Sequence, residues 1–200
     1  MRDLKDRIQR RIHHAGRGAV HVSKDFLDLG NRAAVDQALS RLVKAGMLRR
    51  VERGLFVYPR VNPKLGGELA PDPELVATAI GRRRATRVVP SGAAAANALG
   101  VSTQVPGKRV YLTGSGSGTV KLGKQTLRFK QVSPKTLGPE DQATNTVLLA
   151  LQHLGKDGLT DDVMARIRSS LTPGQIRKLL KESRYSVGWI ADAVKRIAKE

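Results

Sequence analysis

The sequence predicts an α+β fold in two parts, a small helical module with a β-hairpin and then a mixed α/β region. Three observations support this prediction. Residues 23–46 read as two helices joined by a short turn, residues 47–59 as a basic hairpin, and the chain after residue 139 as helices. A helix-turn-helix that continues directly into a hairpin is typical of a winged helix. We therefore expect an N-terminal winged helix-turn-helix, followed by a mixed α/β domain with a small sheet and a helical C-terminal part.

The first helix is predicted by the spacing of Leu4, Ile8 and Ile12, which places one apolar stripe on a basic surface. The segment GRGAVHV that follows reads as a loop. Ser23 is then the expected N-cap of a short helix, and Gly30 is expected to close that helix in the left-handed conformation.

The next helix should have one buried face and one exposed face. Asn31 is its predicted N-cap, and Gly46 should end it. The apolar face follows the i, i+3, i+4, i+7, i+8 spacing and comprises Val35, Ala38, Leu39, Leu42 and Val43. The opposite face comprises Arg32, Ala33, Asp36, Gln37, Ser40, Arg41 and Lys44.

Residues 48–58 alternate weakly around the turn ERG, which predicts a hairpin. Leu55 and Val57 would share one face, with Phe56 and Tyr58 on the other, and the pattern leaves open which face meets the helices.

The rest of the chain begins with a stretch rich in proline and glycine, which indicates a linker. PELVATAIGRRR then reads as a helix, RVVP as a strand, and SGAAAANALG as a helix whose four alanines permit close packing, expected against a sheet. RVYLT, TVKLG and TLRFKQV read as strands. The predicted domains are a winged helix-turn-helix domain over 1–60, a linker over 61–72, and an α+β domain over 73–200 with a helical tail over about 138–200.

The charge of the chain points to a polyanionic partner. Its 36 Lys and Arg against 17 Asp and Glu give a net charge of +19. Residues 1–60 carry +8, residues 61–130 carry +8 and residues 131–200 carry +3. Basic faces gain affinity for nucleic acids by displacing counterions from phosphates. A solvated basic surface that maintains solubility is the alternative.

A recognition helix presents its exposed side chains to the base edges of the major groove. Arg32 can reach guanine and Gln37 can make a bidentate contact to adenine, whereas Asp36 would repel a nearby phosphate. Lys24, Arg41 and Lys44 are better placed to contact phosphates. Arg50 and Arg53 of the wing could enter the minor groove or bind the DNA backbone. The expected DNA-binding residues are Lys24, Asn31, Arg32, Gln37, Arg41, Lys44, Arg50 and Arg53. Winged helices also dock proteins, which is the alternative.

The densest cationic cluster consists of Arg82, Arg83, Arg84 and Arg87. It could extend the DNA footprint or meet an acidic protein partner. A solvated helix end is an equally ordinary reading, because cations are favoured at helix C-termini.

No pattern predicts catalysis, a cofactor or a metal site. GSGSG at 114–118 lacks the spacing of a dinucleotide fingerprint or a P-loop and is followed by a strand, so we expect a hairpin turn. The four histidines lack metal-ligand spacing and are expected at the surface. Asp161 and Asp162 fit the first turn of a helix capped by Thr160. A nucleic-acid enzyme is therefore the least supported alternative.

The chain has no cysteine, which fits a reducing compartment. Its charged N-terminus does not resemble a signal peptide, and its longest apolar stretch, VLLALQHL, is too short to cross a bilayer. These features predict a cytoplasmic protein without a membrane partner.

Three segments together resemble a known family. A winged helix ending in RRVERGLFVYP, then VVPSGAAAANALGVSTQVP (88–106) and YLTGSGSGTVKLGKQTLRFKQV (111–132), are similar to the antitoxins of type IV abortive-infection (AbiE) systems and to relatives of those antitoxins whose function is not known. The resemblance covers roughly residues 1–135, and the tail after about residue 138 matches no motif.

The resemblance implies an antitoxin that represses its own operon. The N-terminal domain would bind operator repeats, with Arg32, Gln37 and Arg41 in the recognition helix and Arg50 and Arg53 in the wing. The next domain would oppose a nucleotidyltransferase-like toxin, without a stable complex being required. A protein-interaction module, or a stand-alone basic regulator without a toxin, is the alternative.

Overall fold

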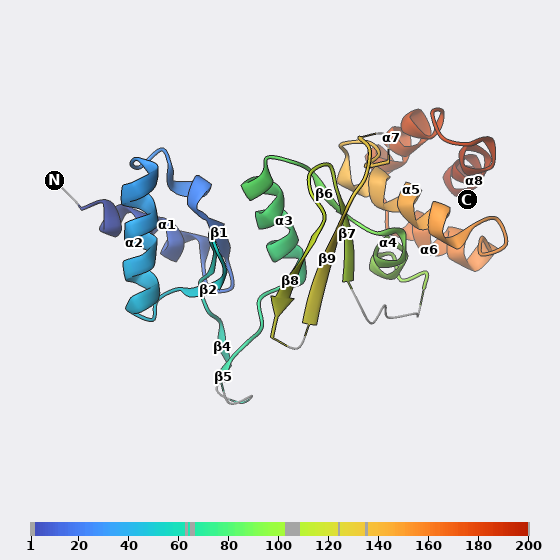
Figure 1. Ribbon diagram of the computed structural model, residues 1–200. Helices are drawn as coiled ribbons and strands as arrows, with labels where there is room; N and C mark the ends of the chain where they lie inside the picture. Colours follow the sequence, from blue (N-terminus) through green and yellow to red (C-terminus); the bar gives the residue numbers. More distant parts are fainter. Residues whose placement is uncertain are drawn as a thin grey trace. The chain divides into compact units, whose positions relative to one another are not determined.

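The computed structural model shows the predicted α+β fold, with helices α1–α8, a short 3-10 helix η1 and strands in three small sheets (Figure 1). It describes residues 3–62, 64, 67–102, 109–123, 125–134 and 136–199. Parts of the predicted linker (63, 65 and 66) and of the segments that carry the family resemblance (103–106 and 124) lie outside the described residues.

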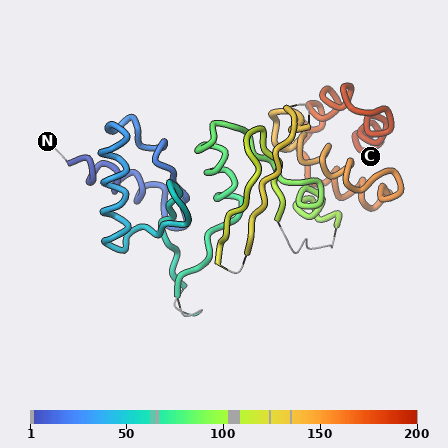
Figure 2. The backbone as a smooth tube through the Cα atoms, in the orientation of Figure 1, coloured from blue at the N-terminus to red at the C-terminus, as the bar shows by residue number. Residues whose placement is uncertain are grey.

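The N-terminal elements have the order of a winged helix-turn-helix, as predicted. They are α1 (Leu4–Ala15), β1 (Val20–Val22), η1 (Ser23–Phe26), α2 (Arg32–Lys44), β2 (Arg49–Glu52) and β3 (Leu55–Val57). The three strands form an antiparallel sheet in the order β1-β3-β2, with Val20 opposite Val57 and Val22 opposite Leu55. Figure 2 traces this path in blue and cyan.

One core holds these elements together. Ile8 and Ile12 of α1 pack with Leu39 of α2, Phe26 of η1 and Phe56 of β3, all buried. The sequence left open which face of the wing meets the helices. In the structure it is the face that carries Phe56. Leu55 and Val57 on the opposite face are buried as well, so the central strand is covered on both sides.

The prediction for α2 is confirmed at both ends. The Asn31 side chain accepts a hydrogen bond from the backbone N–H of Ala34 at 2.9 Å, which makes it the N-cap. Gly46 follows the last turn with φ of 73°, the left-handed conformation that glycine tolerates. This helix therefore forms from local signals.

The predictions for the segment before α2 are wrong in three respects. GRGAVHV contains strand β1, which is too short to show alternation and is fixed by pairing with β3. Ser23 does not cap η1, because Val22 is the N-cap and its N–H bonds the Asp25 carboxylate. Gly30 is not left-handed, and a Cβ there would lie 3.0 Å from the end of the Leu4 side chain of α1.

The remaining elements follow the sequence prediction closely. They are β4 (Val61–Asn62), β5 (Gly67–Glu68), α3 (Pro73–Arg84), β6 (Val88–Pro90), α4 (Gly92–Ala98), β7 (Arg109–Thr113), β8 (Gly118–Leu122), β9 (Gln125–Gln131), α5 (Gln142–Leu154), α6 (Asp161–Ser169), α7 (Pro173–Ser183) and α8 (Gly188–Lys199). Strands β4 and β5 pair within the predicted linker, and the third sheet has the order β6-β7-β9-β8. GSGSG is therefore not a hairpin turn, because β7 and β8 are not neighbours; the hairpin is β8–β9.

The chain divides into two compact units, one of residues 1–88 and 115–129 and the other of residues 89–114 and 130–200. Helix α3, which the sequence prediction placed with the residues that follow it, groups with the winged helix and packs against β1 and η1. Whether residues 1–60 and 73–200 fold as separate domains stays a prediction.

In the second unit, α4 packs closely against helix α5, whereas the sequence predicted that it packs against a sheet. Ala95 and Ala96 are buried beside Leu149 and Ala150, and a Cβ on Gly92 would lie 2.8 Å from the Leu149 carbonyl oxygen. Helices α5 to α8 enclose a second apolar cluster, which contains Leu151, Met164 and Ile190 among others. No helix among the described residues is long and apolar enough to cross a membrane.

Candidate nucleic-acid interface

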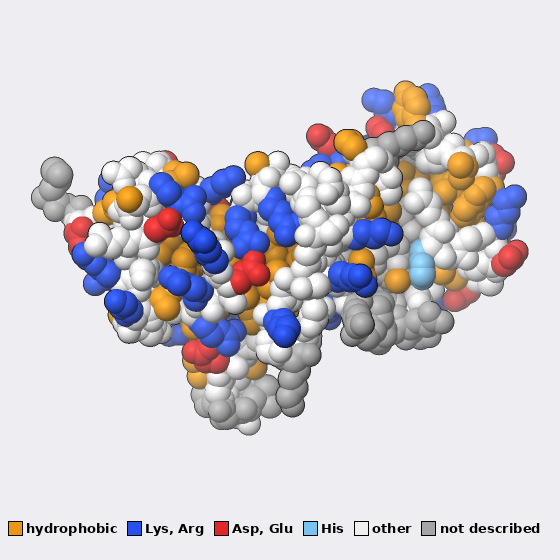
Figure 3. Space-filling view, viewed as in Figure 1, with side chains coloured by type: hydrophobic (Ala, Val, Ile, Leu, Met, Phe, Trp, Pro, Cys, Tyr) orange, Lys and Arg blue, Asp and Glu red, His pale blue; other side chains and the backbone are white. Residues whose placement is uncertain are grey.

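All eight side chains predicted to contact DNA lie on exposed residues of the first unit. Arg32, Gln37, Arg41 and Lys44 project from the face of α2 that is opposite its buried stripe, and Asn31 caps that helix. Lys24 lies on η1, and Arg50 and Arg53 lie on the wing formed by β2, β3 and their turn. Figure 3 shows Lys and Arg side chains gathered over this unit, with a few carboxylates among them.

A hollow of about 480 Å³ brings part of this set together. Lys24, Arg32, Arg50 and Arg53 line it, and Arg83 of α3 adds a fifth cation. Of the described residues that line this hollow, Asp36 alone is acidic. Gln37, Arg41 and Lys44 do not line it and continue the exposed face along α2. The concave, strongly basic lining can hold a phosphate-like anion close to the start of α2.

Most of these cations are open to an external partner. Among the residues that the structure describes, Lys24, Arg41, Lys44, Arg50 and Arg53 form no ion pair. The Arg50 guanidinium lies over the Phe56 ring, 5.5 Å from its centroid, which aims the charge without neutralising it.

Arg32 is the exception on α2. Its Nε donates to Oδ2 of Asp36 at 2.7 Å, one helical turn away, and both side chains are about half exposed. Burial would raise the pKa of Asp36, but the Ser23 hydroxyl and the Arg32 guanidinium outweigh it and lower that pKa. Asp36 is therefore a stable anion that holds Arg32 through Nε and leaves its terminal nitrogens for another partner.

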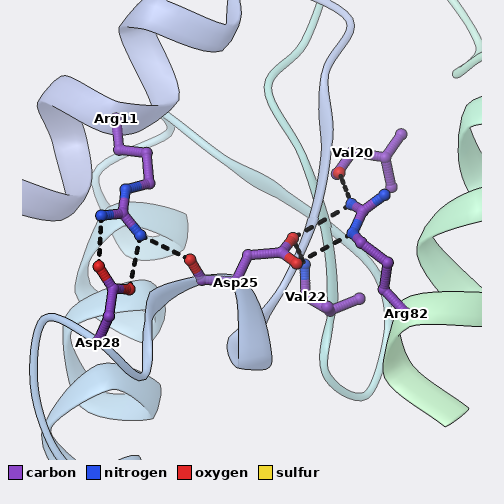
Figure 4. A network of polar contacts seen from close by, with 6 residues as sticks. All are labelled: Arg11, Val20, Val22, Asp25, Asp28 and Arg82. Carbon is purple, nitrogen blue, oxygen red and sulfur yellow. Dashed lines mark hydrogen bonds and ion pairs between the residues drawn. The ribbon is translucent and has the colours of Figure 1, made fainter. Parts of the chain in front are cut away.

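The second basic cluster is mostly engaged inside its own unit. Arg82 binds the Asp25 carboxylate through Nε at 3.0 Å and through a terminal nitrogen at 3.1 Å, and also donates to the Val20 carbonyl at 2.8 Å (Figure 4). Arg83 pairs with Glu52 at 2.5 Å and donates to the Arg53 carbonyl at 2.9 Å.

Arg84 completes the pattern of internal contacts. It donates to the carbonyls of Ser115 and Gly116 and lies over Phe129. Arg82, Arg83 and Arg84 are therefore not a solvated helix end. They hold neighbouring backbone, and whether they also touch DNA stays a prediction, as it does for half-buried Arg87.

The other side of η1 is held by α1. Arg11 forms two bonds with the Asp28 carboxylate, at 2.7 and 2.6 Å, and donates to the Asp25 carbonyl at 2.8 Å (Figure 4). The Arg11 hydrogen bond lowers the pKa of Asp28 and raises that of Arg11. The first helical turn of the motif is thus held between guanidinium groups from α1 and α3.

The expectation of surface histidines holds for His13, His14 and His153 and is wrong for His21. His21 lies on β1 between two buried valines, is 7% exposed, and packs against Phe26. Burial lowers its pKa, which Asp25 nearby raises and Arg82 lowers further. Among the described residues, no group of three His, Cys, Asp or Glu side chains could hold a metal ion.

Sequence reasoning missed Asp25 and Glu52 as parts of this region, and it placed Arg83 only in the second basic cluster. Each acts through a partner that is distant along the chain, 57 residues away in the case of Asp25 and Arg82. Local spacing carries no signal for such contacts.

The fold and this exposed basic face define a winged helix-turn-helix protein with a candidate anion-binding interface. The chain belongs to a family of unknown function, DUF6088, which it matches over residues 7–179 and therefore through both units. A comparison with curated proteins found no match.

Proposed function

We propose that this protein binds double-stranded DNA through α2 and the wing and represses transcription of its own operon. The observation that carries the proposal is the set of exposed cations on η1, α2 and the wing, most without an internal partner among the described residues. An arrangement of this kind suits the phosphates that flank a groove occupied by a helix.

The roles within the interface follow from position. Arg32, steadied by Asp36, and Gln37 are on the exposed face of α2 and would read base edges. Lys24, Arg41 and Lys44 would contact phosphates and set the register, with Asn31 at the helix start. Arg50 and Arg53 would bind the backbone or enter the minor groove. The hollow between them would seat one backbone phosphate.

We further propose that the protein acts as an antitoxin of the type IV kind, which opposes a nucleotidyltransferase-like toxin. The resemblance of residues 88–106 and 111–132 to AbiE antitoxins supports this finer assignment. A reading frame for a nucleotidyltransferase-like protein beside the gene would support it, and rescue of cells that express that protein would test it.

Binding of the full chain to its own promoter tests the DNA-binding proposal. Fluorescence anisotropy with the promoter duplex and a shuffled duplex should show tighter binding to the promoter. For both, log affinity should fall linearly with log salt concentration, because each neutralised phosphate adds about 0.9 to the slope. Equal, salt-insensitive affinity for both duplexes, or no binding at low salt, would refute the proposal.

A second candidate, protein interaction, is favoured by one observation in the second unit. Tyr185 and Val187, between α7 and α8, are 85% and 59% exposed, and they lie two residues apart, so they offer a protein partner adjacent apolar side chains. Capture of a stoichiometric protein partner, without protection of any duplex in footprinting, would favour this function over repression.

A further inference from the structure

Besides Asp36, two acidic residues lie on the elements that would face DNA, where negative charge should weaken binding. Asp25 belongs to η1, and Glu52 ends the first strand of the wing. Each is bonded to an arginine from the last turn of α3: Asp25 to Arg82, and Glu52 to Arg83. The two contacts come from consecutive residues of one helix.

Each arginine also holds backbone. Arg82 donates to the Val20 carbonyl on β1, and Arg83 donates to the Arg53 carbonyl at the turn of the wing. A guanidinium that binds a carboxylate and a carbonyl together is fixed in orientation by its planar set of donors. Lysine donates from a single nitrogen, so it could not reproduce the two-point contact of Arg82 with Asp25 in the same geometry.

The elements held in this way are short, and the core fixes them through Phe26 of η1 and Phe56 of the wing. Helix η1 is a single turn of four residues, and the wing is a short hairpin at the edge of its sheet. The contacts from α3 therefore add to the core and to the pairing of β3 with β1 in setting the position of η1 relative to the wing. Lys24 of η1 and Arg50 and Arg53 of the wing line the same hollow as Arg83, so the spacing of η1 and the wing sets the spacing of these cations.

We propose that Arg82 and Arg83 are positioning residues for DNA binding, and that Asp25 and Glu52 are their anchors. Helix α3 then belongs to the DNA-binding unit as the part that fixes η1 and the wing at the separation the duplex requires. The inference rests on the proposed DNA-binding function. The sequence suggested that these arginines contact phosphates. The inference assigns them a different role, which is to hold η1 and the wing in position.

The two roles predict opposite changes in DNA affinity when the acidic partner of each arginine is neutralised. If Arg82 contacts phosphate, Asp25→Asn removes a competing anion and should strengthen binding. If Arg82 positions η1, the same change releases it and should weaken binding about tenfold, the equivalent of one charged hydrogen bond. Glu52→Gln should behave in the same way. Asp6→Asn, which removes an exposed carboxylate of α1 without an ion pair among the described residues, is the matched control and should bind slightly more tightly.

The experiment measures affinity of the full chain for its promoter duplex over a range of salt concentrations. Arg82→Gln and Arg82→Lys should each weaken binding about tenfold with an unchanged salt slope, whereas loss of a phosphate contact would reduce the slope by about 0.9. The losses in the double variant Asp25→Asn/Arg82→Gln should be less than the sum of the two single losses, because each single variant already removes the Asp25–Arg82 contact. Circular dichroism at the assay temperature would confirm that each variant is folded.

The result that would overturn the inference is tighter binding by Asp25→Asn together with a reduced salt slope for Arg82→Gln. If Asp25→Asn and Arg82→Gln both fold and bind the duplex with unchanged affinity, the inference is overturned as well. A purely structural contact would alter only the melting temperature. If Arg82 variants do not fold, the Glu52–Arg83 pair gives the same test independently. Failure of the wild-type chain to bind any duplex would instead refute the proposed function.

Discussion

The arginines of the wing and those of α3 look alike in the sequence and differ in the structure. Arg50 and Arg53 are exposed and form no ion pair among the described residues. Arg82 and Arg83, also in a dense basic stretch, are each bonded to a carboxylate and a carbonyl. Net charge therefore locates a basic region, whereas the partners of each guanidinium decide whether that arginine can bind a ligand.

The strongest test of this comparison removes the two open cations of the wing. Arg50→Ala/Arg53→Ala should reduce the salt slope by about 1.8 and affinity at 0.1 M salt on the order of 50-fold, because two released counterions per molecule are lost. Anisotropy titrations would measure both. The control Arg177→Ala/Arg184→Ala removes two exposed arginines of the second unit and should leave the slope unchanged. Equal losses in both variants would show that bulk charge, rather than the wing, drives binding.

A smaller effect should separate phosphate contacts from base contacts on α2. Arg41→Ala should weaken binding to every duplex about tenfold, because one phosphate contact is lost. Gln37→Ala should lower the preference for the promoter over a shuffled duplex by about 1–3 kcal/mol while leaving the salt slope intact. Competition titrations with both duplexes would measure this. Equal losses on both duplexes for Gln37→Ala would contradict its assignment.

Arg32 shares features with both the open arginines of the wing and the bonded arginines of α3, because its side chain is exposed and yet forms an ion pair with Asp36. Asp36→Asn should strengthen binding to a shuffled duplex about threefold, because an anion leaves the interface. It should also reduce discrimination, because Arg32 loses the partner that orients it. A variant that gains affinity for both duplexes equally would show that Asp36 only repels phosphate.

The smallest expected effect concerns stability and His21. Its pKa is lowered by burial, so the folded chain keeps it neutral while the unfolded chain takes up a proton below the ordinary value of 6.5. This contribution is present above pH 6.5 and is lost progressively as the pH falls below that value towards the folded pKa.

Thermal melts from pH 8 to pH 5 would measure this loss, and His21→Phe should reduce it. Asp28 and Asp36 have lowered pKa values too, but their contributions are lost only below the ordinary value of 3.8, outside this window. Parallel pH curves for His21→Phe and the wild type would contradict the role of His21.

The sequence predicted what depends on local signals. The spacing of Leu4, Ile8 and Ile12 was enough to place α1, and Asn31 and Gly46 were enough to bound α2. The exposed face of α2 followed from the same periodicity, because a helix with one apolar stripe must expose the other side.

The sequence could not predict what depends on distant partners. Strand β1 exists because β3 pairs with it, and His21 is buried because that strand is covered. The contacts of Arg82 and Arg83 join α3 to elements far earlier in the chain, so no local pattern separated them from surface charges. The prediction of a hairpin turn at GSGSG is wrong because the order of strands in a sheet is not a local property of the sequence.

The most direct test of duplex binding by α2 and the wing is residue-resolved. In a ¹⁵N-labelled sample of the full chain, addition of the promoter duplex should shift the amide signals of residues 31–44 and 49–57 most strongly, with the signals of residues 142–199 almost unchanged. Shifts concentrated in residues 142–199, with the signals of α2 and the wing unaffected, would show that the duplex does not bind at α2 and the wing.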